Sequence, residues 1–371
     1  MSKATSHLNR VFFPALIVIA ATSPLLPAQH TDAAPAAPAY KNLTVLKDVP
    51  ADQIGPAMQF MTTSLGVECA FCHVQGKMEA DDKGAKKTAR EMITMTNEIN
   101  KTHFGGRQQI TCNSCHRGAA RPVAIPPVME TDAMPAKPAA PPASAPGAAQ
   151  AVTPPTAAQI IAKYTEALGG EANIRKVTSR VMKGNILTGG QQTPIEVLSK
   201  APNKRVSITH MGSSDSFTAF DGNTGWMGNT GRPARAMSAS ESASSALDSE
   251  LYLSLRLTEL YPQMRRGRPE TINGVECEVL NGQNAGHPPV RLYFDKNSGL
   301  LVRMVRYSET PLGRLPVQID YADYRDVDGV RTAFRWTLSR PNGRFTIQIA
   351  DAKNNVPVDD ARFAKPAAEV K

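Results

Sequence analysis

The sequence of 371 residues has no cysteine before residue 69, no apolar run long enough to span a membrane, and no block of basic residues. The missing early cysteine excludes a lipid anchor on a cysteine near the N-terminus. The apolar run at residues 11–21 is shorter than the roughly 20 residues that a membrane-spanning helix needs, and Pro14 interrupts it. The net charge of +9 is spread along the chain, so no nucleic-acid partner is predicted. From residue 157 onward the sequence has no Ser/His/Asp set, phosphate loop or metal-spaced carboxylates.

Residues 1–34 are predicted to be a signal peptide or an N-terminal anchor. Lys3 and Arg10 precede the apolar run, and small residues and prolines follow it, which is the order of a secretory signal. Cleavage is expected near residues 28–34, with an uncleaved anchor as the alternative. Either way, the rest of the chain is predicted to be periplasmic, with membrane association as a possible addition.

Four of the five cysteines stand in two copies of the pattern Cys-x-x-Cys-His. The six residues are Cys69, Cys72, His73, Cys112, Cys115 and His116. A thioredoxin-like pair would need a preceding strand, which neither copy has, and a zinc site of four cysteines would leave both histidines without a role. Covalent haem attachment uses every residue, because both cysteines form thioethers with the haem and the adjacent histidine binds the iron. Two copies therefore predict two haem c groups.

The second axial ligand of each iron is predicted to be a methionine, a usual haem ligand in electron-transfer cytochromes. A pair of methionines three residues apart precedes each motif on a predicted helix, and glycines follow each helix, the first being Gly66. One methionine of each pair can instead fill the core. The candidate ligands are Met58 or Met61 for the first haem, and Met92, Met95 or His103 for the second.

The segments MQFMTTSLGVECAFCH, AREMITMTNEIN and ITCNSCHRG resemble the cytochrome c subunit of photosynthetic reaction centres. The resemblance covers residues 42–122 and implies two haem segments, each a helix, a turn and a Cys-x-x-Cys-His. It implies Met58 as the sixth ligand of the first haem and favours Met92 over Met95 for the second. That family's subunit carries four such segments and a lipidated cysteine, whereas this chain has two segments. The implied activity is electron transfer with redox proteins in the periplasm or at the membrane.

Two other functions are kept as alternatives to an electron carrier. A dihaem peroxidase-like enzyme would need one iron whose sixth position is empty or displaceable. A lipid- or partner-binding periplasmic protein would use the haem part as an accessory module.

The chain is predicted to be a multidomain α+β protein. An all-α dihaem c-type cytochrome domain over residues 41–122 is followed by a Pro/Ala-rich linker over 123–156 and an antiparallel β half-barrel with helices over 157–371. The linker is expected to be a semi-rigid tether between domains that need not pack together. Helical patterns are expected at 156–170 and 245–262, and short hairpin turns at 297–299 and 328–329.

The C-terminal part also resembles the half-barrel of outer-membrane lipoprotein carriers, through FDGNTGW and YFDKNSGLLVR. That resemblance implies a concave face that either holds an apolar ligand or is filled by the protein's own core. Cys277 lies in an alternating, strand-like run and is expected to pack as a small apolar residue.

Overall fold

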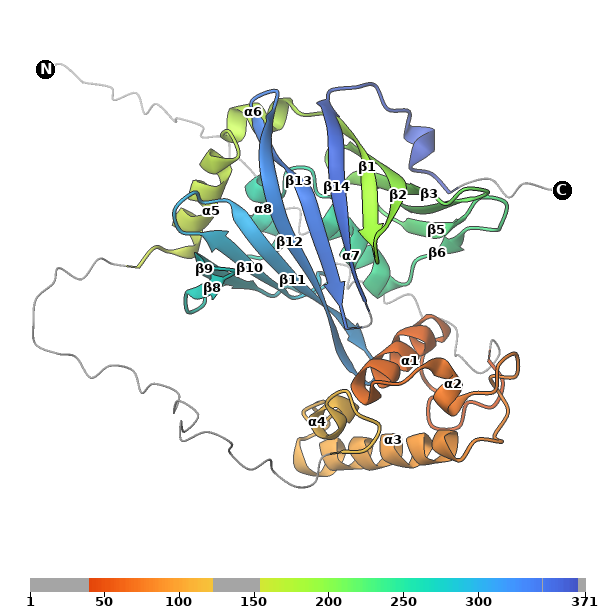
Figure 1. The fold of residues 1–371 in the computed structure, drawn as a ribbon. Helices are drawn as coiled ribbons and strands as arrows, with labels where there is room; N and C mark the ends of the chain where they lie inside the picture. The colour runs from red at the N-terminus through yellow and green to blue at the C-terminus, as the bar shows by residue number, and fades with distance from the viewer. Residues whose placement is uncertain (1–39, 123–153, 342, 366–371) are drawn as a thin grey trace, which may run out of the picture.

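The computed structural model describes residues 40–122, 154–341 and 343–365. The predicted signal segment at residues 1–34 and most of the predicted linker lie outside the described residues. Figure 1 shows a helical part formed by residues 40–122 and a curved sheet with flanking helices formed by the remainder. Within the described ranges, no helix is both long enough and apolar enough to cross a membrane.

The helical part contains two long helices, each followed by one of the Cys-x-x-Cys-His motifs. The four helices are α1 (Ala51–Leu65), α2 (Cys69–Cys72), α3 (Gly84–His103) and α4 (Cys112–His116). Helix α1 ends at Gly66, whose φ of 64° is the left-handed conformation that glycine adopts most readily. This confirms the stop predicted before the first motif.

The C-terminal part is one open antiparallel sheet. Its strands are β1 (Ser179–Thr188), β2 (Gln191–Lys200), β3 (Lys204–His210), β4 (Asp215–Phe220), β5 (Gly225–Asn229), β6 (Arg235–Ala236), β7 (Arg265–Arg266), β8 (Glu270–Ile272), β9 (Val275–Gly282), β10 (Val290–Asp295), β11 (Leu301–Thr310), β12 (Gly313–Val327), β13 (Val330–Arg340) and β14 (Gly343–Asn354). The order is β6-β5-β4-β3-β2-β1-β14-β13-β12-β11-β10-β9-β7, with β8 beside β9. The predicted antiparallel half-barrel is therefore confirmed.

The two faces of the sheet are covered by different segments. The helices are α5 (Ala157–Ala167), α6 (Glu171–Lys176), α7 (Ala239–Ser249) and α8 (Leu253–Leu260), and a 3₁₀ turn, η1, spans Asp360–Arg362. Side chains of α5, α7 and α8 join the main apolar core on the concave face. Phe363, after η1, packs on the opposite face with Leu198 and Val206. Cys277 on β9 has no exposed surface, which confirms that it packs as an apolar residue.

The predicted single helix at 245–262 is wrong, because the chain breaks into α7 and α8. Glu250 ends α7 with extended backbone angles. The amide of Leu251 donates to the Pro202 carbonyl at 3.0 Å, and the Tyr252 hydroxyl donates to the Val177 carbonyl at 3.0 Å. The bond from the Leu251 amide replaces the intrahelical bond that a continuous helix would need, and the Tyr252 side chain holds the chain at the break.

The helical part and the sheet are in contact, although the sequence suggested that they need not pack together. The hairpin between β11 and β12 places Leu312 and Leu315 in the apolar cluster that contains Phe60 and Ile93. The Gln108 side chain also donates to the Pro311 carbonyl at 2.7 Å. The helical part therefore completes its core with residues from the sheet, which local sequence patterns do not reveal.

Candidate functional site

Each Cys-x-x-Cys-His motif forms one short helical turn. In the first motif the amide of His73 donates to the Cys69 carbonyl at 3.0 Å, which closes the turn. In the second motif the amide of Thr111 donates to the Ser114 hydroxyl oxygen at 3.0 Å, which holds the start of α4. None of the four motif cysteines forms a disulfide, and Cys69 and Cys115 are exposed. Burial raises the pKa of the Cys72 and Cys112 thiols.

The two motif histidines are held in the same way. Nδ1 of His73 lies 2.8 Å from the Met78 carbonyl oxygen, and Nδ1 of His116 lies 2.9 Å from the Ala119 carbonyl oxygen. A carbonyl can only accept, so each Nδ1 carries the proton. In the neutral imidazole, Nε2 is then the nitrogen with a free lone pair, which can bind a metal. A hydrogen bond from the ring nitrogen that does not bind the metal sets both the tautomer and the ring orientation of a ligating histidine.

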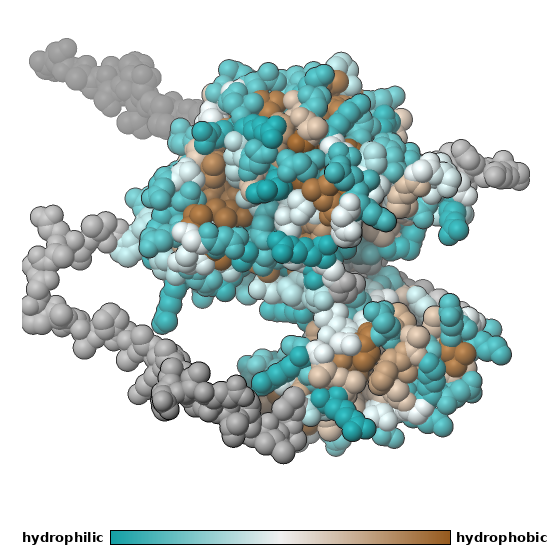
Figure 2. Space-filling view, viewed as in Figure 1, coloured by the Kyte–Doolittle hydropathy of each residue, from teal (hydrophilic) through white to brown (hydrophobic). Residues whose placement is uncertain are grey.

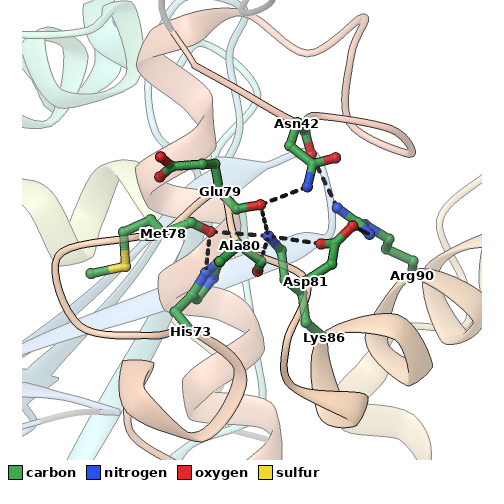
Figure 3. Close-up of polar contacts among 8 residues, drawn as sticks. All are labelled: Asn42, His73, Met78, Glu79, Ala80, Asp81, Lys86 and Arg90. Carbon is green, nitrogen blue, oxygen red and sulfur yellow. Dashed lines mark hydrogen bonds and ion pairs between the residues drawn. The ribbon is translucent and has the colours of Figure 1, made fainter.

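The carbonyl that orients His73 belongs to a loop that closes around the ammonium group of Lys86 (Figure 3). Lys86 Nζ donates to three consecutive carbonyls, those of Met78, Glu79 and Ala80, at 2.9–3.0 Å. It also pairs with Asp81 at 3.2 Å. Only 9% of Lys86 is exposed, although lysine is normally a surface residue. Lys86 therefore fixes the loop that holds the histidine.

Two further residues tie this loop to the N-terminal segment. The Arg90 guanidinium donates to Asp81 at 3.0 Å and to the Asn42 carbonyl at 3.1 Å. The Asn42 amide donates to the Glu79 carbonyl at 2.6 Å. The hydrogen bond from Arg90, with further ones from Asn42 and Lys86, lowers the pKa of Asp81 from its ordinary 3.8. Asp81 therefore stays ionised between the two cations at neutral pH.

Asn100 organises the approach to the second motif. Its side-chain amide donates to the Ile110 carbonyl at 2.7 Å, and its side-chain oxygen accepts from the amides of Gln109 and Ile110 at 3.0 and 2.9 Å. These bonds hold the segment that leads into Cys112. Sequence reasoning missed both Asn100 and Lys86, because each resembles a solvent-exposed residue of an amphipathic helix.

The candidate methionine ligands differ in exposure. Met58 is half-buried and packs against the same apolar cluster as Met61 and Cys112. Met92 is half-buried, whereas Met95 is 41% exposed and His103 is exposed. Helix α1 lies against α4, and the Gly118 amide donates to the Ser64 carbonyl at 2.8 Å. Met58 thus lies on a helix that contacts the second motif and that precedes the first motif in sequence.

Apolar side chains are exposed around the first motif. Figure 2 shows brown and tan surface over the helical part. The exposed large apolar residues of the described chain include Phe71 within the first motif, Met78 beside His73, and Met95 on α3. Phe71 and Met78 therefore leave apolar surface exposed beside the cysteines and histidine of the first motif. In the described residues no three Cys, His, Asp or Glu side chains are grouped closely enough to hold a metal ion.

These features define a class of protein. A helical unit carries two Cys-x-x-Cys-His motifs, and a backbone carbonyl orients the histidine that ends each motif. This unit is joined to a curved antiparallel sheet. Residues 12–186 match the family described as "Photosynthetic reaction centre cytochrome C subunit". The photosynthetic reaction center cytochrome c subunit of Roseobacter denitrificans is 34% identical over 96 residues. The matched region is 23% of this chain and 26% of that protein, so the chain spans about a quarter of its length. The N-terminal resemblance predicted from the motifs is confirmed.

Solved structures resemble the C-terminal part distantly. A DUF1329 family protein from Desulfovibrio piger has 15% identity and a TM-score of 0.39, over 55% of this chain and 95% of that one. A putative outer membrane lipoprotein-sorting protein domain from Vibrio parahaemolyticus has 12% identity and a TM-score of 0.41, over 55% and 96%. A LolA superfamily protein from Nitrosomonas europaea has 14% identity and a TM-score of 0.40, over 57% and 99%. The half-barrel itself is established by the strand order.

Proposed function

We propose that this chain is an exported dihaem c-type cytochrome that transfers electrons. The observation that carries the proposal is the matched pair of histidines, each with Nδ1 bonded to a backbone carbonyl and Nε2 left to bind iron. The match to the reaction centre cytochrome family supports the same role. Haem c, when bound, supplies an iron that alternates between the ferrous and ferric states.

The residues present fit two covalently attached haem groups. Cys69 and Cys72 would attach the first, and Cys112 and Cys115 the second, because each pair stands on a single helical turn and none of the four forms a disulfide. His73 and His116 would bind the two irons from one side. The exposed apolar side chains of Phe71 and Met78 would be covered by a porphyrin.

Methionines would complete the iron coordination. Met58 is proposed for the first haem and Met92 for the second, because both are half-buried while the alternatives Met95 and His103 are exposed. The contact of α1 with α4 makes Met58 a candidate for the second haem as well. A filled sixth position leaves no site for substrate at the iron, which favours an electron carrier over a peroxidase-like enzyme.

The proposed partners are redox proteins in the periplasm or at the membrane surface. The family match and the signal-like N-terminus support this placement. The photosynthetic role of the matched family is not part of the proposal, because this chain spans about a quarter of the matched relative.

The test is a pyridine haemochrome assay on protein made in cells with a working cytochrome c maturation system. The unmodified chain is expected to carry two haems per polypeptide. Cys69→Ala/Cys72→Ala and Cys112→Ala/Cys115→Ala are each expected to carry one. Cys277→Ala is the matched control, since Cys277 is buried in the sheet, and it should keep two. Full loading of either double variant would contradict the assignment.

Ferric absorption spectra separate the electron carrier from the peroxidase-like alternative. Two six-coordinate haems are expected to give a fully low-spin spectrum. Met58→Ala and Met92→Ala should each convert one haem to high spin, whereas Met95→Ala should not. A high-spin fraction in the unmodified protein would instead support an open coordination site and an enzyme.

A further inference from the structure

The concave face of the sheet encloses a cavity of about 400 Å³. Strands β1 to β4 and β11 to β14 and helices α5, α7 and α8 contribute its walls. Most lining side chains are apolar, among them Met182, Ile195, Ile319 and Met304. The volume lies within the usual range for small-molecule sites, which are mostly apolar with a few placed polar groups.

Arginines occupy strand positions whose side chains point into this cavity. Residues two apart on a strand point to the same face of the sheet. Three arginines each stand two residues from an apolar residue that faces the cavity: Arg180 from Met182, Arg306 from Met304, and Arg340 from Leu338. Each of those partners belongs to the concave core or packs against it. On β3, Arg205 precedes Val206, which packs on the opposite face. Charged residues at core-facing positions are otherwise avoided.

Two of these guanidinium groups lie in one row across the sheet. The strand register pairs Arg180 with Ser199 on β2, and Ser199 with Arg205 on β3. Two strand spacings separate the arginine Cα atoms by about 10 Å. A hydroxyl group therefore stands between two cations on the cavity wall.

Few carboxylates offset these cations. Five arginines but only Asp248 and Glu250 line the cavity. Glu250 already pairs with Arg256, which does not line it. Asp248 binds Arg306 through both oxygens, at 3.2 and 2.7 Å. The cavity lining therefore carries an excess of positive charge.

Arg180 and Arg205 make only neutral hydrogen bonds among the contacts of the described residues. Nε of Arg180 donates to the Asn354 side-chain oxygen at 2.8 Å. Nη1 of Arg205 donates to the Asp248 backbone carbonyl at 3.0 Å, and its guanidinium lies 5.3 Å from the centre of the Trp336 ring. Burial lowers the pKa of Arg180 to about 10, so it stays charged at neutral pH. Arg205 interacts electrostatically with the Asp248 carboxylate, which Arg306 already binds, whereas no carboxylate of the described residues acts on Arg180. A buried cation without a counter-charge of its own is costly unless an anion is bound nearby.

We propose that this cavity binds an amphiphile with one alkyl chain and an anionic head group, its head between Arg180 and Arg205 and its chain along the apolar wall. The head group is a carboxylate or a phosphate ester, since guanidinium groups bind both through paired hydrogen bonds. The site is independent of haem attachment, because its residues all belong to the C-terminal part.

The experiment compares four probes with the same twelve-carbon chain, titrated calorimetrically into the haem-loaded full chain. Dodecanoate and dodecyl phosphate are expected to bind at one per polypeptide, and dodecanol at least tenfold more weakly. Dodecyltrimethylammonium should not bind. Tighter binding of dodecyl phosphate than of dodecanoate would identify a phosphate ester as the natural head group, and the reverse order a carboxylate. Equal binding of dodecanol and both anions would overturn the proposal.

Variants locate the head group. Arg205→Gln and Arg180→Gln should each weaken dodecanoate binding at least tenfold while leaving dodecanol binding unchanged. Arg335→Gln is the control, because Arg335 is exposed on β13 and does not line the cavity. Unchanged dodecanoate affinity in a folded Arg205→Gln/Arg180→Gln protein would overturn the assignment. The haem content of each sample is measured by absorbance, so that a failure of haem attachment is distinguished from a failure of dodecanoate binding.

Discussion

Replacing Lys86 with methionine removes the charge at the centre of the first motif's loop while keeping a side chain of similar length. The ammonium group donates to three carbonyls and pairs with Asp81. The substitution leaves those carbonyls without this donor and puts a thioether among polar atoms. We expect the helical part to lose stability, because a buried acceptor that loses its partner incurs a desolvation cost.

The size of the effect follows from these contacts. A hydrogen bond from a charged donor contributes about 1.5–3 kcal/mol, and three such bonds to one group are not additive. The loop is close to solvent, since Met78 is 52% exposed, so water can hydrate part of the freed carbonyls. Asp81 also keeps its bond to Arg90. We therefore expect Lys86→Met to reduce the free energy of unfolding by about 2–4 kcal/mol.

Urea unfolding of the haem-loaded protein, followed by haem absorbance, measures this loss. Lys87→Met is the matched control, because Lys87 is the exposed neighbour on the same helix. It should change the free energy of unfolding by less than about 0.5 kcal/mol. If the two variants unfold at the same urea concentration, Lys86 does not hold the loop and the reasoning is refuted.

The same substitution has a second readout at the haem proposed for the first motif. The Met78 carbonyl accepts from both Lys86 and His73, so the cation draws electron density from the acceptor that orients the histidine. Without Lys86 the hydrogen bond from His73 should strengthen and make the imidazole a stronger donor to iron. The reduction potential of the first haem should fall, by about 40 mV for each 1 kcal/mol. The haem proposed for the second motif should keep its potential, because His116 there is oriented by the Ala119 carbonyl instead.

Three further predictions concern other parts of the molecule. Asn100→Ala should lower haem content at the second motif and reduce stability by about 1–3 kcal/mol, whereas Asn97→Ala, an exposed neighbour, should do neither. A methyl group at Gly313 would meet the Phe60 ring at 2.3 Å, so Gly313→Ala should destabilise the contact between helical part and sheet and speed proteolysis there; Gly343→Ala, in open space, should not. The folded pKa of Asp81 lies below its ordinary 3.8, so its stabilisation is present above about pH 4 and lost as pH falls further; in acid titrations Asp81→Asn should remove that dependence.

Features that depend on neighbouring residues were predictable from the sequence. Gly66 ends α1 because glycine adopts a positive φ without steric cost. Asp328 and Gly329 form the turn between β12 and β13 with φ of 54° and 81°, as the sequence predicts. The alternating apolar pattern likewise located β9 and placed Cys277 in the core.

Features that depend on contacts distant in sequence were not predictable in the same way. The break after α7 arises from hydrogen bonds to Val177 and Pro202, which lie far away along the chain. The docking of the β11–β12 hairpin depends on Leu312 meeting the helical core. Arg205 reads as an ordinary strand residue, and only the strand register aligns it with Arg180 across the cavity wall.

Intact mass spectrometry of the chain made in cells with working cytochrome c maturation tests haem attachment most directly. We predict a mature polypeptide heavier than its amino-acid mass by two haem groups, with the added mass on peptides that contain Cys69 with Cys72 and Cys112 with Cys115. A chain that leaves such cells with the mass of its amino acids alone would contradict the proposed function.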